Sequence, residues 1–178
     1  IGTNRYYDIR RCNVAIEGLN ESTLPDATRQ TLKGQFFFMR AFVYFRLVSL
    51  YGGVPLILKS QTLEDELNVP RAKTSTCIAA IINDLDSAAA NLPATWAGND
   101  IGRISRGAAL AVKGKVLMYW ASPQVNPTNI ASRWEDAYQA NLAAFNQCTA
   151  DGYLLINNYS NLFITEDHKE ILLVRKYN

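Results

Sequence analysis

The chain has 178 residues, of which 48% are hydrophobic and 19% charged, a composition that allows one domain with a sizeable hydrophobic core. The net charge is +2, and the lysines and arginines are spread along the chain, which argues against a nucleic-acid-binding protein and against attraction to an anionic membrane. The chain has three cysteines, an odd number, and none of them has C-x-x-C spacing. We therefore interpret Cys12, Cys77 and Cys148 as small buried residues and not as a disulfide framework.

Neither end of the chain has the features of a protein terminus. The sequence begins at Ile1 without a signal-like apolar segment, and its last residues, EILLVRKYN, are typical of a strand. We therefore expect an interior fragment of a longer chain.

Hydrophobic spacing predicts a first helix over about 6–19 and a second over 26–51. The second helix has apolar residues in three sectors of its helical wheel, Phe36 and Met39 among them, so we expect it to be the most buried helix. Replacing either residue by alanine is then expected to cost roughly 2–5 kcal/mol. Arg40 and Arg46, in the same helix, are interpreted as structural, either paired or extended towards solvent.

The second helix is expected to end at Gly52-Gly53, because a glycine suits the left-handed cap and Pro55 prevents continuation. A third helix is predicted from about residue 75, with Asp84 on its solvated side. A fourth begins after the N-cap Ser105 and ends near residue 121. A fifth covers 134–148, with a buried stripe of Trp134, Ala137, Tyr138, Phe145 and Cys148.

The fold class predicted from these elements is mostly α, in one domain over 1–178. The later helices begin about thirty residues apart, close to the tetratricopeptide period of about 34 residues. We expect helix pairs over 6–51, 75–121 and 134–148 in an α-α superhelix, with short strands at 153–156 and 170–175. Because a strict repeat consensus is absent, an irregular helical domain is the alternative.

A succession of segments resembles the SusD/RagB family of nutrient-binding outer-membrane lipoproteins over essentially all of the chain. Single segments are weak signals, but their order and spacing are specific. The segments are DIRRCN (8–13), GQFFFMRAFVYFRLVSLYGGVPLIL (34–58), IINDLDSAAANLP (81–93), GRISRGAALAVKGKVLMYWASP (102–123), WEDAYQANLAAF (134–145), YSNLF (159–163) and EILLV (170–174).

The resemblance implies a scaffold of tetratricopeptide-like helix pairs and a location on the outer-membrane surface through an N-terminal lipid anchor that this chain does not contain. It also implies two partners: an oligo- or polysaccharide ligand, and a SusC-like TonB-dependent transporter that receives it. The sugar-stacking residues of the family lie mostly outside the matched segments. No motif position of this chain therefore inherits such a role.

The residues themselves offer one candidate ligand site. Sugar recognition needs an exposed aromatic face beside groups that bond hydroxyls, and the loop after Pro93 provides Trp96, Asn99, Asp100 and Arg103. The alternative is that Trp96 folds inward and closes the end of a helix pair. The start of the chain, with Tyr6, Tyr7, Arg10 and Arg11, is a further segment that can contact a ligand or the transporter.

Catalytic chemistry is not indicated. His168 is the only histidine, so it is the sole centre available for a His-based triad or metal site, and its polar surroundings favour a solvated loop residue. We predict no catalytic residues, no metal and no cofactor, and a non-enzymatic protein that captures glycans. A tetratricopeptide-like scaffold that binds only proteins is the alternative, and a helical hydrolase is disfavoured.

Overall fold

The computed structural model describes residues 4–165 and 167–175, and it confirms the mostly helical fold class. The chain forms two compact units, Ile1–Asn91 and Leu92–Asn178. The single domain expected over 1–178 remains a prediction. None of the helices in the described ranges is long and apolar enough to cross a membrane.

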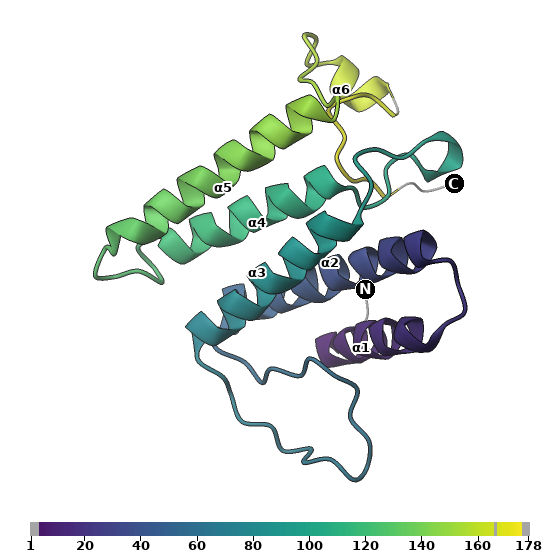
Figure 1. Cartoon of the computed structure of the whole chain (residues 1–178). Helices are drawn as coiled ribbons and strands as arrows, with labels where there is room; N and C mark the ends of the chain where they lie inside the picture. Colours follow the sequence, from purple (N-terminus) through teal and green to yellow (C-terminus); the bar gives the residue numbers. More distant parts are fainter. Residues whose placement is uncertain (1–3, 166, 176–178) are drawn as a thin grey trace. The chain divides into compact units, whose positions relative to one another are not determined.

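The first unit is a three-helix arrangement of α1 (Arg5–Glu21), α2 (Asp26–Tyr51) and α3 (Thr74–Asn91). The central helix α2 packs against both α1 and α3, and a long irregular loop connects α2 to α3 (Figure 1). As predicted, α2 ends at Gly52, whose φ of +71° is a conformation that glycine adopts without strain.

The core of the first unit is formed by one side of each helix. Residues that are almost completely buried include Ile9, Phe38, Tyr44, Ile81 and Leu85. Cys12 and Cys77 are also buried and free, as expected, and burial raises the pKa of the Cys12 thiol to about 11.

The prediction that α2 is the most buried helix, with Phe36 and Met39 inside, is wrong for Met39. Met39 keeps 41% of its surface exposed and Leu50 keeps 72%, while Phe36 is only partly buried. Within the first unit, α2 is covered by α1, by α3 and by the loop that follows it, and these neighbours leave Met39 and Leu50 exposed. The distribution of apolar residues around the α2 helical wheel therefore predicts more burial than the structure shows.

Asp84 was expected on the solvated side of α3, and this prediction is also wrong. Its side chain is buried and forms a bidentate pair with Arg40 of α2, with both N–O distances at 2.7 Å. The predicted structural pairing of Arg40 is thereby confirmed. Burial raises the pKa of Asp84, and the Arg40 guanidinium opposes this shift.

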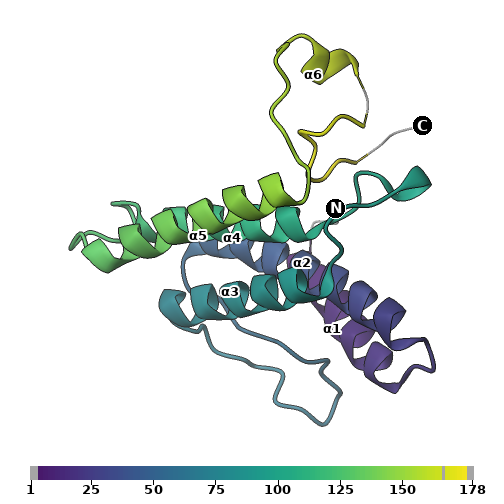
Figure 2. The same ribbon diagram turned by 45° about the horizontal axis from the view of Figure 1, so that its top comes forward.

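The second unit contains α4 (Arg106–Ala121), α5 (Ala131–Ala150), the short 3-10 helix η1 (Gly98–Asp100) and the one-turn helix α6 (Asn161–Ile164). Helices α4 and α5 lie side by side (Figure 2). They approach closely at Gly114, where a Cβ atom would lie 2.4 Å from Oδ1 of Asn141. As predicted, Ser105 caps α4 by accepting from the N–H of Ala108.

Within the first unit, α1 packs on α2, the two helices of the predicted pair over 6–51, and α2 also packs on α3. Within the second unit, α4 packs on α5. The pair expected over 75–121 remains a prediction.

The predicted stripe on α5 is only partly buried. Ala137 is buried and Cys148 is half-buried, but Trp134, Tyr138 and Phe145 keep 42%, 59% and 66% of their surfaces exposed. Helix α5 contacts α4 through small residues, so its large aromatic side chains remain outside the contact. The second unit also contains all three tryptophans, at positions 96, 120 and 134.

The segments predicted as strands, 153–156 and 170–175, form no β-strand in the residues that the structure describes. The N–H of Leu154 in the first segment donates to the carbonyl of Lys169, the residue just before the second segment, at 3.1 Å. Another backbone hydrogen bond joins Val174 to Gly102 at 2.9 Å. Apolar runs of this length do not form a ladder unless a partner strand lies alongside.

Candidate functional site

The loop with the predicted ligand residues lies between α3 and α4, in the second unit. Trp96 is half-buried, and its indole N–H donates to the carbonyl of Ile104 at 2.9 Å. The guanidinium carbon of Arg103 lies 5.0 Å from the centre of the Trp96 ring, and Nη1 of Arg103 lies 2.8 Å from Oδ1 of Asp100. The structure thus brings Trp96, Asp100 and Arg103 together.

Asn99 is exposed in η1, and its side chain forms no hydrogen bond with the residues that the structure describes. The indole of Trp96 has one face next to Arg103 and its N–H group already engaged. These contacts fix the loop against the start of α4. Stacking of a ligand on the ring remains a prediction.

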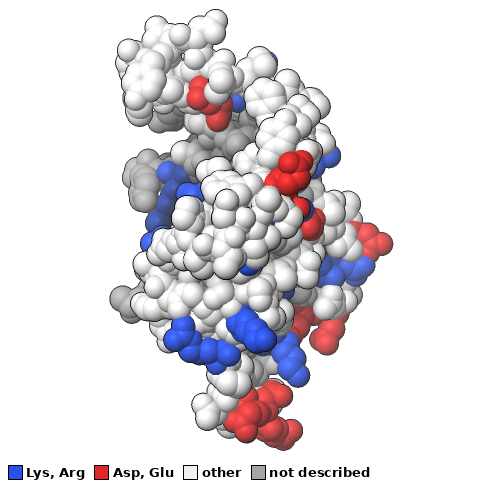
Figure 3. Space-filling view, turned by 90° about the vertical axis from the view of Figure 1, so that its left-hand side faces the viewer, with Lys and Arg blue, Asp and Glu red and all other residues white. Residues whose placement is uncertain are grey.

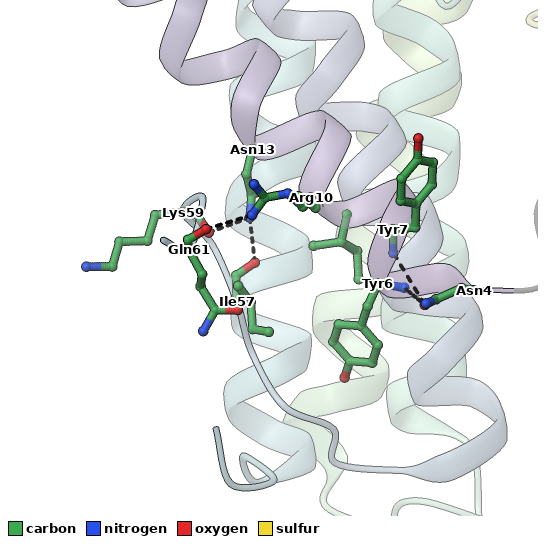
Figure 4. A pocket seen from close by; sticks show the side chains of 9 residues that line it. Asn4, Tyr6, Tyr7, Arg10, Asn13, Ile57, Lys59 and Gln61 are labelled. Carbon is green, nitrogen blue, oxygen red and sulfur yellow. Dashed lines mark hydrogen bonds between the residues drawn. The ribbon is translucent and has the colours of Figure 1, made fainter. Parts of the chain in front are cut away.

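A hollow of about 280 Å³ lies at the start of α1, and we call it the α1 hollow. Figure 4 shows its two sides, the first turns of α1 and the extended segment 57–61. Its lining residues are Asn4, Tyr6, Tyr7, Ile9, Arg10, Asn13, Ile57, Lys59 and Gln61.

The α1 side of the hollow follows from helical geometry. The Asn4 side chain caps α1 by accepting from the N–H groups of Tyr6 and Tyr7, which fixes where the helix begins. Tyr6, Arg10 and Asn13 follow at spacings of four and three residues and therefore share one face. Tyr7 is the most exposed ring of the hollow, with 59% of its surface accessible.

The other side of the hollow is held by hydrogen bonds from helix side chains to the loop backbone. The Asn13 amide donates to the carbonyls of Ile57 and Lys59 at 3.0 and 2.9 Å. Nη1 of Arg10 donates to the carbonyl of Gln61 at 2.7 Å. These contacts leave the Lys59 ammonium and further N–H groups of Arg10 available to a ligand. The Tyr7 ring is exposed, with the guanidinium carbon of Arg11 5.8 Å from its centre on one face.

A buried polar network supports this loop from below. Nη1 of Arg40 donates to Oδ1 of Asn13 at 2.8 Å and to the carbonyl of Leu58 at 2.9 Å. The Tyr44 hydroxyl accepts from the N–H of Ile57 at 2.7 Å, and burial raises its pKa. The loop carrying one wall of the hollow is thus tied to the core of the first unit.

A second hollow of about 520 Å³ adjoins the first and shares Asn4 and Tyr6 with it. We call it the α2 hollow, because its far side is the last turns of α2. Its other lining residues are Arg5, Arg46, Leu47, Leu50 and Tyr51. The Tyr6 hydroxyl, between the two hollows, donates to the carbonyl of Pro55 at 2.9 Å, and burial raises its pKa.

The sequence pointed to the α1 side of this site but not to its second side. The mixture of Tyr6, Tyr7 and Arg10 was noted as a surface that can contact a ligand. The contribution of 57–61 depends on a tertiary contact with α1, which no local pattern encodes. The one usable signal was the shared helical face of Tyr6, Arg10 and Asn13.

Charge on the molecular surface is mixed. The face drawn in Figure 3 carries small separate groups of basic and acidic side chains among uncharged residues. A continuous basic stripe of the kind that binds nucleic acid is not seen on that face.

Comparisons with known proteins agree on one family. A family model described as "Starch-binding associating with outer membrane", SusD-like, matches residues 3–118. SusD-like protein P38 of Formosa agariphila is 30% identical in an alignment of length 148, which covers 75% of this chain and 28% of that protein.

Solved structures give the same result. A SusD-like protein from Bacteroides fragilis superimposes with a TM-score of 0.83 and 30% identity, over 98% of this chain and 32% of that one. A laminarin binding SusD-like protein gives a TM-score of 0.71 and 26% identity, over 91% of this chain and 33% of that one. The chain thus spans about a third of the length of the relatives that it matches.

Proposed function

This chain belongs to the SusD-like family, and from that premise we propose that it binds oligo- or polysaccharides at the outer-membrane surface and passes them to a transporter. The family description names starch binding and association with the outer membrane. One of the structural relatives is a laminarin binding protein. A SusC-like TonB-dependent transporter is the partner that we propose for the transfer.

The observation that carries this proposal is the composition of the α1 hollow. Tyr7 presents an accessible ring, and side chains with hydrogen-bonding groups surround it. Sugars bind to such surfaces because their C–H faces stack on aromatic rings while their hydroxyls bond to amides and cations. The polar groups in the hollow belong to Asn4, Arg10, Lys59 and Gln61.

We propose a non-catalytic role, with the bound glycan released unchanged. The carbohydrate-binding description of the family supports this role. The proposal predicts that the purified protein generates no new reducing ends from a glycan that it binds. Reproducible cleavage that disappears on a single substitution in this chain would contradict it.

A second candidate is a scaffold that binds other proteins. The exposed aromatic side chains of α5, Trp134, Tyr138 and Phe145, favour it, because clustered exposed aromatic residues are typical of protein contacts. This candidate predicts protein capture without measurable glycan affinity.

The test compares two tyrosines of equal exposure. Tyr7 and Tyr138 each keep 59% of their surface accessible on a helix, but only Tyr7 lines the hollow. Tyr7→Ala is expected to weaken binding of the best ligand from a glycan array by about 1–3 kcal/mol, by analogy with base stacking on aromatic rings. Tyr138→Ala is expected to leave the affinity unchanged. Isothermal titration measures both, and equal affinities for the two variants would count against the α1 hollow.

A further inference from the structure

The α1 and α2 hollows share an unusual charge pattern. Together they are lined by four cationic side chains, those of Arg5, Arg10, Arg46 and Lys59. No aspartate or glutamate is among the residues that line either hollow. In a chain with eighteen basic and sixteen acidic residues, this segregation is a local feature and not a result of composition.

Most of the cationic side chains that line the two hollows form no ion pair with an acidic side chain that the structure describes. Within the described residues, Arg10, Arg46 and Lys59 form no ion pair within 4.0 Å, and all three side chains are exposed. Arg5 has a long ion pair with Asp8, at 3.9 Å. Lys59 lies near enough to Glu17 and Asp65 to contribute to their lowered pKa values, but neither carboxylate lines a hollow.

Cationic side chains next to exposed tyrosine rings favour one chemical class of sugar over another. A neutral sugar needs hydroxyl partners, which amides and carboxylates supply as well as arginines do. An arginine bonds a planar anion through two parallel N–H groups, and a lysine adds a point charge. The first turn of α1 adds the partial positive charge of a helix N-terminus, and it also carries Asp8, which pairs with Arg5.

We propose that the two hollows at the start of α1 bind glycans that carry anionic groups, either carboxylates or sulfates. The ring of Tyr7 holds the sugar face, and Arg10 and Lys59 bond the anionic group in the α1 hollow. Arg5 and Arg46 receive a second anionic unit in the α2 hollow. This inference rests on the proposed glycan-binding function and specifies its ligand class.

The experiment measures affinity by isothermal titration for three tetrasaccharides: maltotetraose, tetragalacturonate and a sulfated carrageenan fragment. We expect one or both anionic ligands to bind about tenfold more tightly than maltotetraose, since several surface charge contacts together reach this size. The preference is expected to decrease as sodium chloride is raised, because salt screens exposed charges. The ligand that binds distinguishes carboxylate from sulfate.

Variants that each remove one positive charge identify the residues that cause the preference for the anionic ligand. Arg10→Gln and Lys59→Gln are each expected to weaken binding of the anionic ligand several-fold more than they weaken binding of maltotetraose, because only the anionic ligand loses a charge contact as well as a hydrogen bond. Lys115→Gln, an exposed lysine on α4 outside both hollows, is the matched control and is expected to have no effect.

Each outcome has a distinct meaning. Equal or tighter binding of maltotetraose, or insensitivity of the anionic ligand to both substitutions, overturns this inference and leaves the proposed function standing. Binding of a polyglutamate peptide as tightly as tetragalacturonate overturns it in favour of an acidic protein partner. No binding by any glycan overturns the inference and the proposed function together.

Discussion

At the scale of single residues, the pair of Arg40 and Asp84 has a large expected effect on stability. Both side chains are buried, and their bidentate contact is completed by Asn13 and by the carbonyl of Leu58. A buried ion pair gives little net stability compared with a well-packed apolar pair, but removing one partner leaves an unpaired charge in the interior.

Asp84→Ala is therefore expected to lower the free energy of unfolding by about 3–5 kcal/mol. Asn83→Ala, at the exposed neighbouring position, is expected to change it by less than about 0.5 kcal/mol. Urea denaturation followed by circular dichroism measures both. The double substitution Arg40→Met with Asp84→Leu is expected to recover most of the loss, and a double variant as unstable as Asp84→Ala would argue against this explanation.

At the scale of elements, α2 shows how far a hydrophobic pattern predicts burial. Phe38 and Met39 are neighbours in the same apolar run, yet Phe38 is 1% exposed and Met39 is 41% exposed. The pattern located the helix and its glycine cap, because both depend on local chemistry. It did not identify the open side, which depends on the number of neighbouring helices.

Phe38→Ala is expected to destabilise the protein by about 3–5 kcal/mol, because a buried phenylalanine leaves a cavity when removed. Met39→Ala is expected to cost less than about 1 kcal/mol, since its side chain is largely in water already. Thermal or urea unfolding of the two variants checks the difference. Similar losses at both positions would mean that Met39 is buried in the folded protein in solution.

The loop before α4 is the second element with a clear test. The indole N–H of Trp96 bonds the carbonyl of Ile104, which is itself buried at the start of α4. Trp96→Phe keeps a ring but removes this bond, so we expect a loss of about 0.5–1.5 kcal/mol of stability. Trp96→Ala is expected to cost more and to leave glycan affinity unchanged if the ring is structural. Weakened glycan affinity at unchanged stability would restore the loop as a ligand site.

At the scale of the whole molecule, the helices were predictable, but several side-chain contacts between them were not. Periodicity and capping residues such as Ser105 locate helices because they act within a few residues. The contact of Asp84 with Arg40 joins positions 44 residues apart, and nothing in the local sequence of α3 distinguishes Asp84 from a solvated residue. The exposed aromatic side of α5 was missed for the same reason.

The candidate site was predictable only in part. Tyr6, Tyr7 and Arg10 are adjacent enough in sequence to be noticed as a group. Lys59 and Gln61 join them only because the loop after α2 is bonded back onto α1. Trp96, Asp100 and Arg103 do assemble, but mainly with one another.

The placement of the tryptophans has a spectroscopic consequence. All three belong to the second unit, and the rings that line the hollows of the first unit are tyrosines. No indole is among the side chains that line the hollows, so a glycan held by those side chains is expected to leave tryptophan emission at its original wavelength and intensity. A glycan stacked on Trp96 is expected to shift that emission, since the ring then exchanges water for sugar. One titration recorded with selective tryptophan excitation thus tells which of the two surfaces is occupied.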